Sequence, residues 1–312
     1  MFLTERNKSN EHIYLETLSK RAILTQEEEK KLSRLNRGFE GEQLYDQIFD
    51  EVGHQNLNVF RDIWIQADKS LTQIDALIVT DETVFINEIK NYSGNYKYEN
   101  NTWQIGKIQI SDDPIIQSKR AISKLIKIFL ENKINIKTDF NIIFPNPYFI
   151  LSTDDNYCRL KTIKRELMKQ YFRNIQQLTS WNNAERIVQI IQDHIVLEPK
   201  HTTNTDPSRL TPGRQCLKCT SFELTPKRYS TTCNICNHKS LNKDHVLSAI
   251  RDYSVLFPLE NITARNILSF INNEVSKSTV KRYIQEICLL NNRGRHATYT
   301  IEPAQKSLKS IS

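Results

Sequence analysis

The sequence predicts an α/β (α+β) protein in which a mixed sheet is flanked by helices, followed by a small four-cysteine module and a helical module that ends in a hairpin. Three observations lead to this fold class. Short apolar runs rich in β-branched residues alternate with amphipathic helical patterns between residues 38 and 196. Two Cys-x-x-Cys pairs follow within residues 215–240. Three helical patterns and a glycine-containing hairpin occupy residues 244–301.

The composition is that of a globular protein whose charge is unevenly distributed. A chain of 312 residues with 25% charged and 38% hydrophobic residues has room for two or three ordinary domains. The net charge is +7, but 17 Lys and Arg face only 8 Asp and Glu from Lys200 onward, so residues 1–199 sum to −2. A basic final third is typical of a nucleic-acid-binding module, although an ordinary solvated surface can also be basic.

Neither a membrane span nor a secretion signal is apparent in the sequence. No apolar run approaches the roughly 20 residues that cross a bilayer. The first residues include acids and lack the apolar centre of a secretory signal. We therefore expect a cytoplasmic protein with no membrane partner, and no feature predicts an oligomeric state.

Residues 1–36 predict a helical extension, and residues 38–52 predict a separate amphipathic helix. Thr25-Gln26-Glu27-Glu28 has the spacing of a capping box, so a helix should begin at Thr25. Glu42 lies on or beside the apolar face of the second helix, which is unusual for an acid. It either serves a site or is a first-turn acid favoured by the helix dipole.

Three charged side chains interrupt an apolar hairpin formed by residues 74–79 and 84–89: Asp75, Glu88 and Lys90. Glu88 and Lys90 point the same way because side chains two apart share one face of a strand. If Asp75 lies across from them, two carboxylates and an ammonium converge. Two acidic oxygens suit magnesium, and a lysine beside it can orient a water or neutralise charge on a phosphate. The alternative is a buried ion pair with one spare acid.

The segments after the hairpin predict further strands and helices around the sheet. Tyr96, Tyr98 and Trp103 lie in a predicted strand pair, where aromatic rings either pack across strands or stack on bases. Pro114 suits the first turn of a helix that runs to about Glu131. Later patterns predict two strands and two helices, over residues 141–144, 148–151, 160–174 and 184–196.

Four blocks in this order resemble the nuclease-related domain (NERD), a branch of the restriction-endonuclease-like PD-(D/E)xK superfamily. The resemblance covers about residues 36–150. Its blocks are Gly38-Phe39-Glu40-Gly41-Glu42, Gln73-Ile74-Asp75 before an apolar strand, Glu88-Ile89-Lys90-Asn91-Tyr92-Ser93-Gly94, and Asp113-Pro114 with Gln117.

This resemblance implies a restriction-endonuclease-like domain over residues 37–198 that cleaves phosphodiester bonds with Mg²⁺ or Mn²⁺. Asp75, Glu88 and the carbonyl of Ile89 would hold the metal ion, and Glu42 would assist. Lys90 would position the attacking water. Gln117, on the helix that follows, would approach the site.

The cysteine pairs predict a structural zinc site in a ribbon at residues 215–240, after a linker at residues 199–214. Its ligands would be Cys216, Cys219, Cys233 and Cys236. Two Cys-x-x-Cys turns supply the tetrahedral sulfur set that zinc prefers, and four thiolates leave no position open for catalysis. Disulfides are the alternative, but nothing indicates an oxidising compartment.

Residues 241–312 resemble a winged helix-turn-helix. In that fold the third helix, here residues 276–287, enters the major groove of DNA and the wing touches the backbone. The helix residues expected to contact nucleic acid are Lys277, Ser278, Thr279, Lys281 and Arg282. Arg293 and Arg295 would lie on the wing. The alternative is a winged helix that contacts another protein.

Together these features favour a magnesium-dependent DNA nuclease whose zinc ribbon and winged helix bind the substrate. Two other functions remain open. The first is a DNA-binding protein with a non-catalytic nuclease-like core, which would bind in a salt-sensitive way and never cut. The second is a protein-interaction scaffold with no affinity for DNA.

Overall fold

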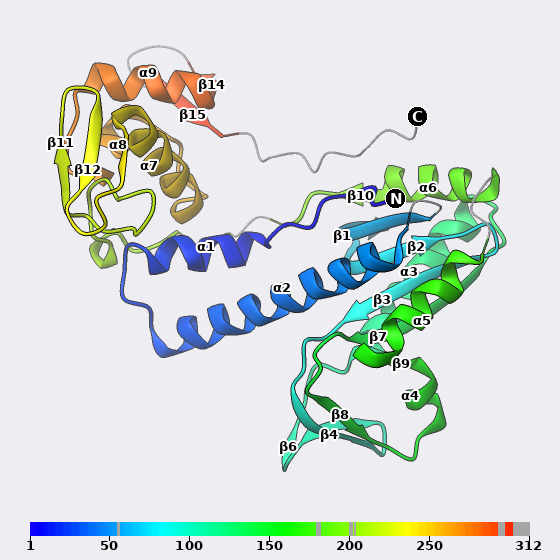
Figure 1. Cartoon of the computed structure of the whole chain (residues 1–312). Helices are drawn as coiled ribbons and strands as arrows, with labels where there is room; N and C mark the ends of the chain where they lie inside the picture. Colours follow the sequence, from blue (N-terminus) through cyan, green and yellow to red (C-terminus); the bar gives the residue numbers. More distant parts are fainter. Residues whose placement is uncertain (55–56, 179–181, 200–201, 203, 293–296, 302–312) are drawn as a thin grey trace. The chain divides into compact units, whose positions relative to one another are not determined.

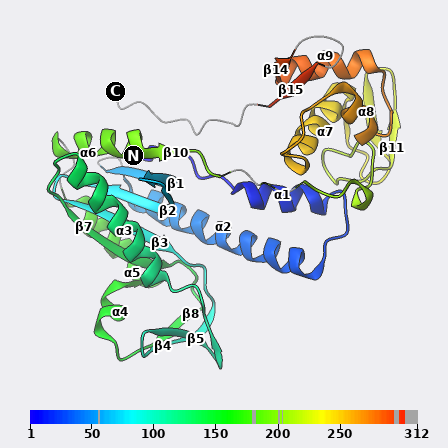
Figure 2. The same ribbon diagram turned by 180° about the vertical axis from the view of Figure 1, so that it is seen from behind.

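The structure is a computed structural model that describes residues 1–54, 57–178, 182–199, 202, 204–292 and 297–301. Contacts divide the chain into two compact units. The first comprises Met1–Lys8 and Arg34–Glu198, and the second comprises Ser9–Ser33 and Pro199–Gln305. Figures 1 and 2 show the elements of both units from opposite sides. The domain boundaries expected from the sequence stay predictions.

A six-stranded mixed sheet with the order β10-β1-β2-β3-β7-β9 is the centre of the first unit. Strands β1, β2 and β3 form an antiparallel meander, and β7 pairs in parallel with β3 and with β9. The strands span Asn58–Ala67 (β1), Ser70–Val79 (β2), Thr83–Ile89 (β3), Lys137–Phe144 (β7), Thr162–Lys164 (β9) and Ile195–Val196 (β10). The predicted α/β fold with a mixed sheet flanked by helices is confirmed.

Helices cover both faces of this sheet (Figures 1 and 2). Helices α3 (Pro114–Glu131) and α6 (Asn182–His194) share one apolar core, to which Leu77 and Ile86 contribute. Helices α2 (Gln26–Val52) and α5 (Arg165–Gln176) share the other core, which contains Ile78. Neighbouring residues of β2 enter opposite cores because strand side chains alternate between faces.

Helix α2 differs from the prediction, because it is one continuous helix rather than two. The capping box is present: the backbone N–H of Thr25 donates to Glu28 Oε2 at 2.7 Å, and that of Glu28 donates to Thr25 Oγ1 at 3.2 Å. The helix then continues through Gly38 and Gly41 to Val52. A glycine costs a helix only about 1 kcal/mol, and no proline interrupts the pattern. The predicted helix over residues 38–52 is therefore present, but it is the second half of α2 and not a helix of its own.

The predicted helix over residues 160–174 is also interrupted. A short helix, α4 (Asn156–Lys161), ends where Thr162–Lys164 becomes β9 and pairs with β7. Helix α5 begins only after this strand. Pairing with a buried neighbour overrides the helical periodicity of the short segment.

A second sheet in the first unit has the order β6-β5-β4-β8. Its strands are β4 (Gly94–Glu99), β5 (Thr102–Ile105), β6 (Ile108–Gln109) and β8 (Phe149–Ser152). Tyr96, Tyr98 and Trp103 are all buried in the core that α3 covers. Their role is therefore packing, and they are not available to stack on bases.

The second unit combines the segment Ser9–Ser33 with the residues that follow Pro199. Arg21, just after α1 (Asn10–Ser19), pairs with Asp252, and Tyr14 contacts Thr205. In the stretch predicted as a linker, the N–H groups of Thr205 and Gly213 donate to carbonyls of the unit, and Pro207–Arg209 forms a short 3₁₀ helix. The described residues of this stretch are therefore part of the second unit.

Three helices, a hairpin and a small sheet make up the rest of the second unit. The helices are α7 (Asn242–Leu256), α8 (Ala264–Phe270) and α9 (Lys277–Ile287), and the hairpin strands are β14 (Leu289–Asn292) and β15 (Thr298–Thr300). Ile262 bridges Tyr299 of the hairpin. The antiparallel sheet consists of β11 (Leu224–Pro226), β12 (Ser230–Cys233) and β13 (Lys239–Leu241).

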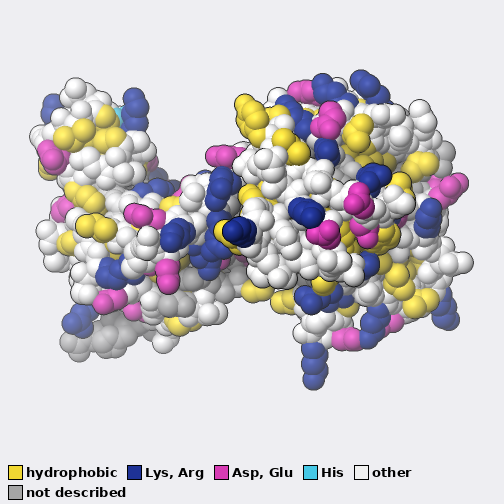
Figure 3. All heavy atoms as spheres, turned by 90° about the horizontal axis from the view of Figure 1, so that it is seen from below, with side chains coloured by type: hydrophobic (Ala, Val, Ile, Leu, Met, Phe, Trp, Pro, Cys, Tyr) yellow, Lys and Arg dark blue, Asp and Glu magenta, His cyan; other side chains and the backbone are white. Residues whose placement is uncertain are grey.

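Charged side chains of both signs lie on the face of the molecule drawn in Figure 3. On the face drawn in Figure 3, basic and acidic side chains are interspersed. The net charge of +7 therefore does not form one broad basic area on that face. Within the described part of the chain, none of the helices combines the length and apolar character needed to cross a membrane.

Candidate functional site

The hairpin of β2 and β3 brings two carboxylates together at its open end. The ladder between the strands ends at the pair of Ala76 and Asn87, and Asp75 and Glu88 are the next residues on the two strands. The charge of Asp75 contributes to the raised pKa of Glu88, so the two carboxyl groups are electrostatic neighbours. Asp75 Oδ2 also accepts the backbone N–H of Ile89 at 2.8 Å, which fixes its carboxyl group at the end of β3.

Lys90 joins this pair just beyond the end of β3. Its backbone N–H donates to the carbonyl of Ile143 in β7 at 2.9 Å, which anchors the residue to the next strand. Its Nζ lies 2.8 Å from Glu88 Oε1, and the two side chains are only 20% and 12% exposed. Asp75, Glu88 and Lys90 therefore meet at one edge of the site, as the hairpin pattern predicts.

Burial and mutual charge shift the titration of these groups. Burial raises the pKa of Asp75, while the charge of Lys90 and the N–H of Ile89 oppose the rise. Burial and the charge of Asp75 raise the pKa of Glu88 to about 7. The pKa of Lys90 is raised, because Glu88 and Asp75 outweigh the opposing effect of burial. Ionisation of both carboxyl groups is thus unfavourable in the protein alone, and a bound cation would favour it.

Helix α2 brings Glu42 to the same place through a close approach at Gly41. A Cβ atom on Gly41 would lie 2.4 Å from the Cβ atom of Asn91, the residue after Lys90. Asn91 Nδ2 also donates to the carbonyl of Arg37 at 2.7 Å. Burial and the charge of Asp75 raise the pKa of Glu42 to about 8, so the two carboxyl groups are electrostatic neighbours.

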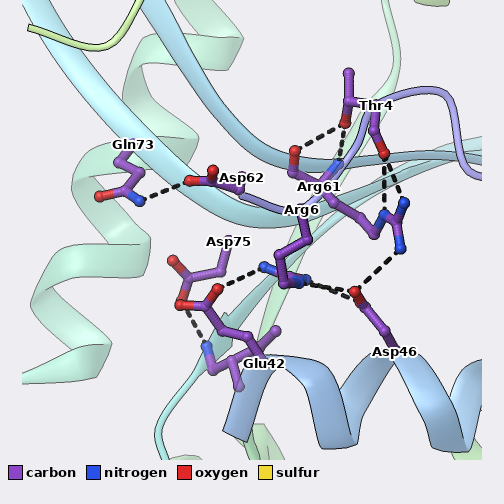
Figure 4. A network of polar contacts seen from close by, with 9 residues as sticks. Thr4, Arg6, Glu42, Asp46, Arg61, Asp62, Gln73 and Asp75 are labelled. Carbon is purple, nitrogen blue, oxygen red and sulfur yellow. Dashed lines mark hydrogen bonds and ion pairs between the residues drawn. The ribbon is translucent and has the colours of Figure 1, made fainter. Parts of the chain in front are cut away.

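Arg6 belongs to this cluster and was not predicted from the sequence. Its Nη1 donates to Glu42 Oε2 at 2.9 Å, and its Nε and Nη2 donate to the two oxygens of Asp46 at 2.8 and 3.0 Å (Figure 4). Residues 1–8 run beside β1, where Phe2 bridges Val59. A single arginine outside any motif carries no sequence signal.

Asp62 is a second residue that sequence reasoning missed. It lies within β1 at a φ of 47°, is 6% exposed, and accepts Gln73 Nε2 at 2.9 Å (Figure 4). Its negative charge raises the pKa values of Asp75 and Glu42. The feature that marks Asp62 is its left-handed backbone conformation, which the structure shows and the sequence does not.

Gln117 lies in the first turns of α3, whose N-cap is Asp113. This helix covers the face of β3 to which Ile86 points, and Glu88 shares that face because it is two residues away. The Oε1 atom of Gln117 is buried and has no hydrogen-bond partner among the residues that the structure describes. A buried amide oxygen on this face is consistent with a position close to the predicted site.

Asp75 and Glu88 offer the oxygen donors that fit a divalent cation. Each carboxylate uses one oxygen for a protein partner, the N–H of Ile89 or the ammonium of Lys90, and has a second oxygen. Ile89, whose carbonyl is the third predicted ligand, directly follows Glu88 in the chain. Hard oxygen ligands of this kind suit Mg²⁺ or Mn²⁺.

Residues 37–147 match the family model described as the nuclease-related domain, NERD. The chain carries a NERD domain. No curated protein and no solved structure matches the chain. The matched residues include Glu42, Asp75, Glu88, Lys90 and Gln117, and they exclude Arg6 and all four paired cysteines.

The four cysteines outside the NERD domain converge on one point. Their Sγ atoms all lie within 4.8 Å of one another, with Cys216–Cys236 at 3.6 Å and Cys219–Cys233 at 3.5 Å. Tetrahedral ligands at Zn–S distances of 2.3 Å stand about 3.8 Å apart. The described cysteines are all free of disulfides. This cluster fits a four-coordinate metal ion, as the Cys-x-x-Cys spacing predicts.

Two turns of the same design form this cluster. The N–H of Thr220 donates to the carbonyl of Cys216 at 3.0 Å, and that of Asn237 donates to the carbonyl of Cys233 at 3.0 Å. Thr220 and Asn237 both have positive φ angles, 59° and 56°. Each turn thereby directs its two sulfur atoms to one side.

The predicted nucleic-acid-binding residues of α9 are mostly on the surface. Lys277, Ser278, Lys281 and Arg282 are exposed and Thr279 is half-buried. Ser276 caps the helix by accepting the N–H of Thr279 at 3.3 Å. Arg293 and Arg295, predicted for the wing, lie outside the described residues.

Proposed function

We propose that this protein is a nuclease that hydrolyses phosphodiester bonds of DNA with the help of Mg²⁺ or Mn²⁺. The observation that carries the proposal is the convergence of Asp75, Glu88 and Lys90 inside a NERD domain. Two carboxylates and one ammonium are the minimum set for such a reaction: the acids hold a cation and the lysine serves the water and the phosphate. The expected cytoplasmic location is part of the same proposal.

Each residue of the site has a stated role in this reaction. Asp75, Glu88 and the carbonyl of Ile89 would hold the cation, which when bound polarises the phosphate and lowers the pKa of water. Lys90 orients the attacking water and stabilises the negative charge that develops on the phosphate. Glu42 assists that water from α2. The water oxygen attacks phosphorus in line, and one ester P–O bond breaks.

We assign substrate binding to the second unit. The four cysteines would hold a zinc ion that keeps β11, β12 and β13 together, since this segment has little apolar core of its own. The order α7, α8, α9 and hairpin supports a winged helix whose α9 reads DNA through Lys277, Lys281 and Arg282. An exposed, donor-rich helix start favours nucleic acid over a protein partner.

One assay tests this proposal and separates it from its competitors. The purified full chain is incubated with labelled single- and double-stranded DNA and RNA, in Mg²⁺, Mn²⁺ or chelator. We expect metal-dependent cleavage of DNA that chelation abolishes. Salt-sensitive binding without cleavage under every condition would identify a non-catalytic DNA-binding protein, and absence of any binding would favour a scaffold.

A further inference from the structure

We propose that Arg6 is a positioning residue of the nuclease site: it holds the carboxylate of Glu42 in place from outside the NERD domain. This inference rests on the proposed function, because Glu42 acts there as the helper of the attacking water. Arg6 lies in the segment Met1–Lys8, which belongs to the same unit as the NERD domain but precedes the residues that match the family.

The three side-chain nitrogens of Arg6 donate hydrogen bonds to two acids of α2. Nε and Nη2 form a bidentate pair with Asp46, which sets the plane of the guanidinium group. Nη1 is then directed at Glu42 Oε2 at 2.9 Å. Glu42 and Asp46 are four residues apart and so lie on the same face of the helix. Arg6 bridges two like charges that would otherwise repel.

A second arginine, Arg61, contacts Asp46 from β1. Arg61 Nη1 donates to Asp46 Oδ2 at 3.0 Å, and its Nε and Nη2 donate to the carbonyl of Thr4 at 3.0 and 2.8 Å. Thr4 in turn exchanges two hydrogen bonds with the backbone of Arg61. The contacts therefore run continuously from β1 through Asp46 and Arg6 to Glu42 (Figure 4).

Arg6 is buried and reaches the site through Glu42, while its other nitrogens hold Asp46. Its side chain is 4% exposed, and burying a guanidinium costs several kcal/mol before its partners offset it. Attachment of residues 1–8 to β1 is already provided by Thr4, Arg61 and the Phe2–Val59 bridge. Figure 4 shows the carboxyl groups of Glu42 and Asp75 next to each other, with Arg6 reaching Glu42.

Two measurements, kcat and the affinity for Mn²⁺, distinguish a positioning role of Arg6 from a purely structural one. Arg6 does not ligate the cation, and its positive charge opposes cation binding. Replacing it with a neutral side chain should therefore lower kcat while leaving the affinity for Mn²⁺ unchanged or higher. Loss of folding would instead weaken both.

The experiment compares R6M, R6K and E42Q in the full chain, with R61M as the matched control. R61M also removes an ion pair to Asp46 but makes no contact with Glu42. We expect R6M to lower kcat about tenfold or more, R61M to stay within about threefold of wild type, and R6K to fall between. Manganese binding by calorimetry should persist in R6M.

A double-mutant cycle decides whether Arg6 acts through Glu42. If it does, R6M/E42Q loses no more activity than E42Q alone, because residues that act as one unit are not additive. Wild-type kcat in R6M, losses that multiply in the double variant, or a tenfold weaker Mn²⁺ affinity would each overturn the inference. If R6M fails to fold, R6K carries the test, and a wild-type kcat in R6K overturns it.

The two proposals fail in different ways. If the wild-type protein does not cleave DNA or RNA with either metal ion, the nuclease proposal falls and the role of Arg6 falls with it. If the wild type cleaves and R6M cleaves equally well, only the role of Arg6 is wrong.

Discussion

Gly41 shows how one missing side chain can set the geometry of the whole site. Its Cα allows α2 to touch Asn91 directly, and this contact carries Glu42 next to Asp75. Gly38, one turn earlier in the same helix, has no atom within 4 Å of where its Cβ would be. The two glycines of the Gly38-Phe39-Glu40-Gly41 motif therefore have different roles, and they form a natural matched pair.

We expect G41A to disrupt the site and G38A to stabilise the protein. The added methyl group of G41A overlaps Asn91 at 2.4 Å and should cost about 1–3 kcal/mol with a marked loss of cleavage. Alanine at position 38 meets open space, and helical alanine is about 0.5–1 kcal/mol better than glycine. Urea unfolding and cleavage assays on both variants measure this. Equal behaviour of the two variants would refute the close-approach role of Gly41.

Residue patterns predicted the centre of the site but not its surroundings. Asp75, Glu88 and Lys90 share a face through strand periodicity and hairpin register, both of which are local properties that a sequence displays. Arg6 and Asp62 enter the site through tertiary contacts of residues with no motif around them. Long-range placement of a single charged residue leaves no periodic signal, so only the fold could reveal them.

At the scale of elements, the start of α2 was predicted and its length was not. The capping box at Thr25 is a four-residue signal that reports one helix end reliably. Whether a helix continues through two glycines depends on what it packs against, and α2 packs on the sheet from Tyr45 onward. In the same way, residues 162–164 form a strand and not a helix because they pair with β7.

The ion pair between Arg209 and Glu28 holds the first turn of α2 in the second unit, and the variant R209M tests its contribution. Arg209 binds Glu28 at 2.7 Å and lowers the pKa of Glu28 to about 2. A lowered pKa contributes stability that is present above the ordinary value of 4.5 and is lost as the pH falls towards 2. R209M should therefore lower the free energy of unfolding by about 0.5–1 kcal/mol at pH 6, given the partial exposure of the pair.

The pH dependence of the difference in unfolding free energy between wild type and R209M is the control for this prediction. The difference between wild type and R209M should shrink between pH 5 and 3, measured by urea unfolding at each pH. A difference that stays constant over this range would show that Arg209 contributes by packing and not through the charge of Glu28.

The cysteine cluster gives a prediction about metal content. We expect about one zinc ion per chain, and C219S should lose it together with the structure of β11, β12 and β13, because metal binding is the folding energy of such a segment. C288S is the matched control, since Cys288 lies outside the cluster. Elemental analysis and proteolysis of the full chain measure both. Retention of zinc in C219S would contradict the assignment.

At the scale of the whole molecule, the charge distribution supports a division between the proposed catalytic site and the proposed DNA-binding surface. Residues 1–199, which include the NERD domain, sum to −2, while the residues from Lys200 onward carry a surplus of positive charge. An acidic catalytic pocket repels phosphates until a cation binds, so affinity for the substrate has to come from elsewhere in the chain. We propose the exposed cations of α9 as this surface.

Removing two of these cations should weaken binding without changing the chemistry. K281A/R282A is expected to bind DNA more weakly at all sequences and to lower the salt slope by about 2, one for each phosphate contact. Its kcat at saturating substrate should match that of wild type. Q285A, on the same helix and uncharged, is the control. An unchanged salt slope in K281A/R282A would place the DNA-binding surface elsewhere.

The central claim is that Asp75 and Lys90 form a metal-dependent catalytic site, and one comparison tests it most directly. Wild type, D75A and K90A are assayed side by side for Mg²⁺-dependent cleavage and for DNA binding, after circular dichroism has verified that each is folded. We predict that both variants bind DNA as the wild type does and no longer cleave it. Equal cleavage by all three proteins would contradict the account.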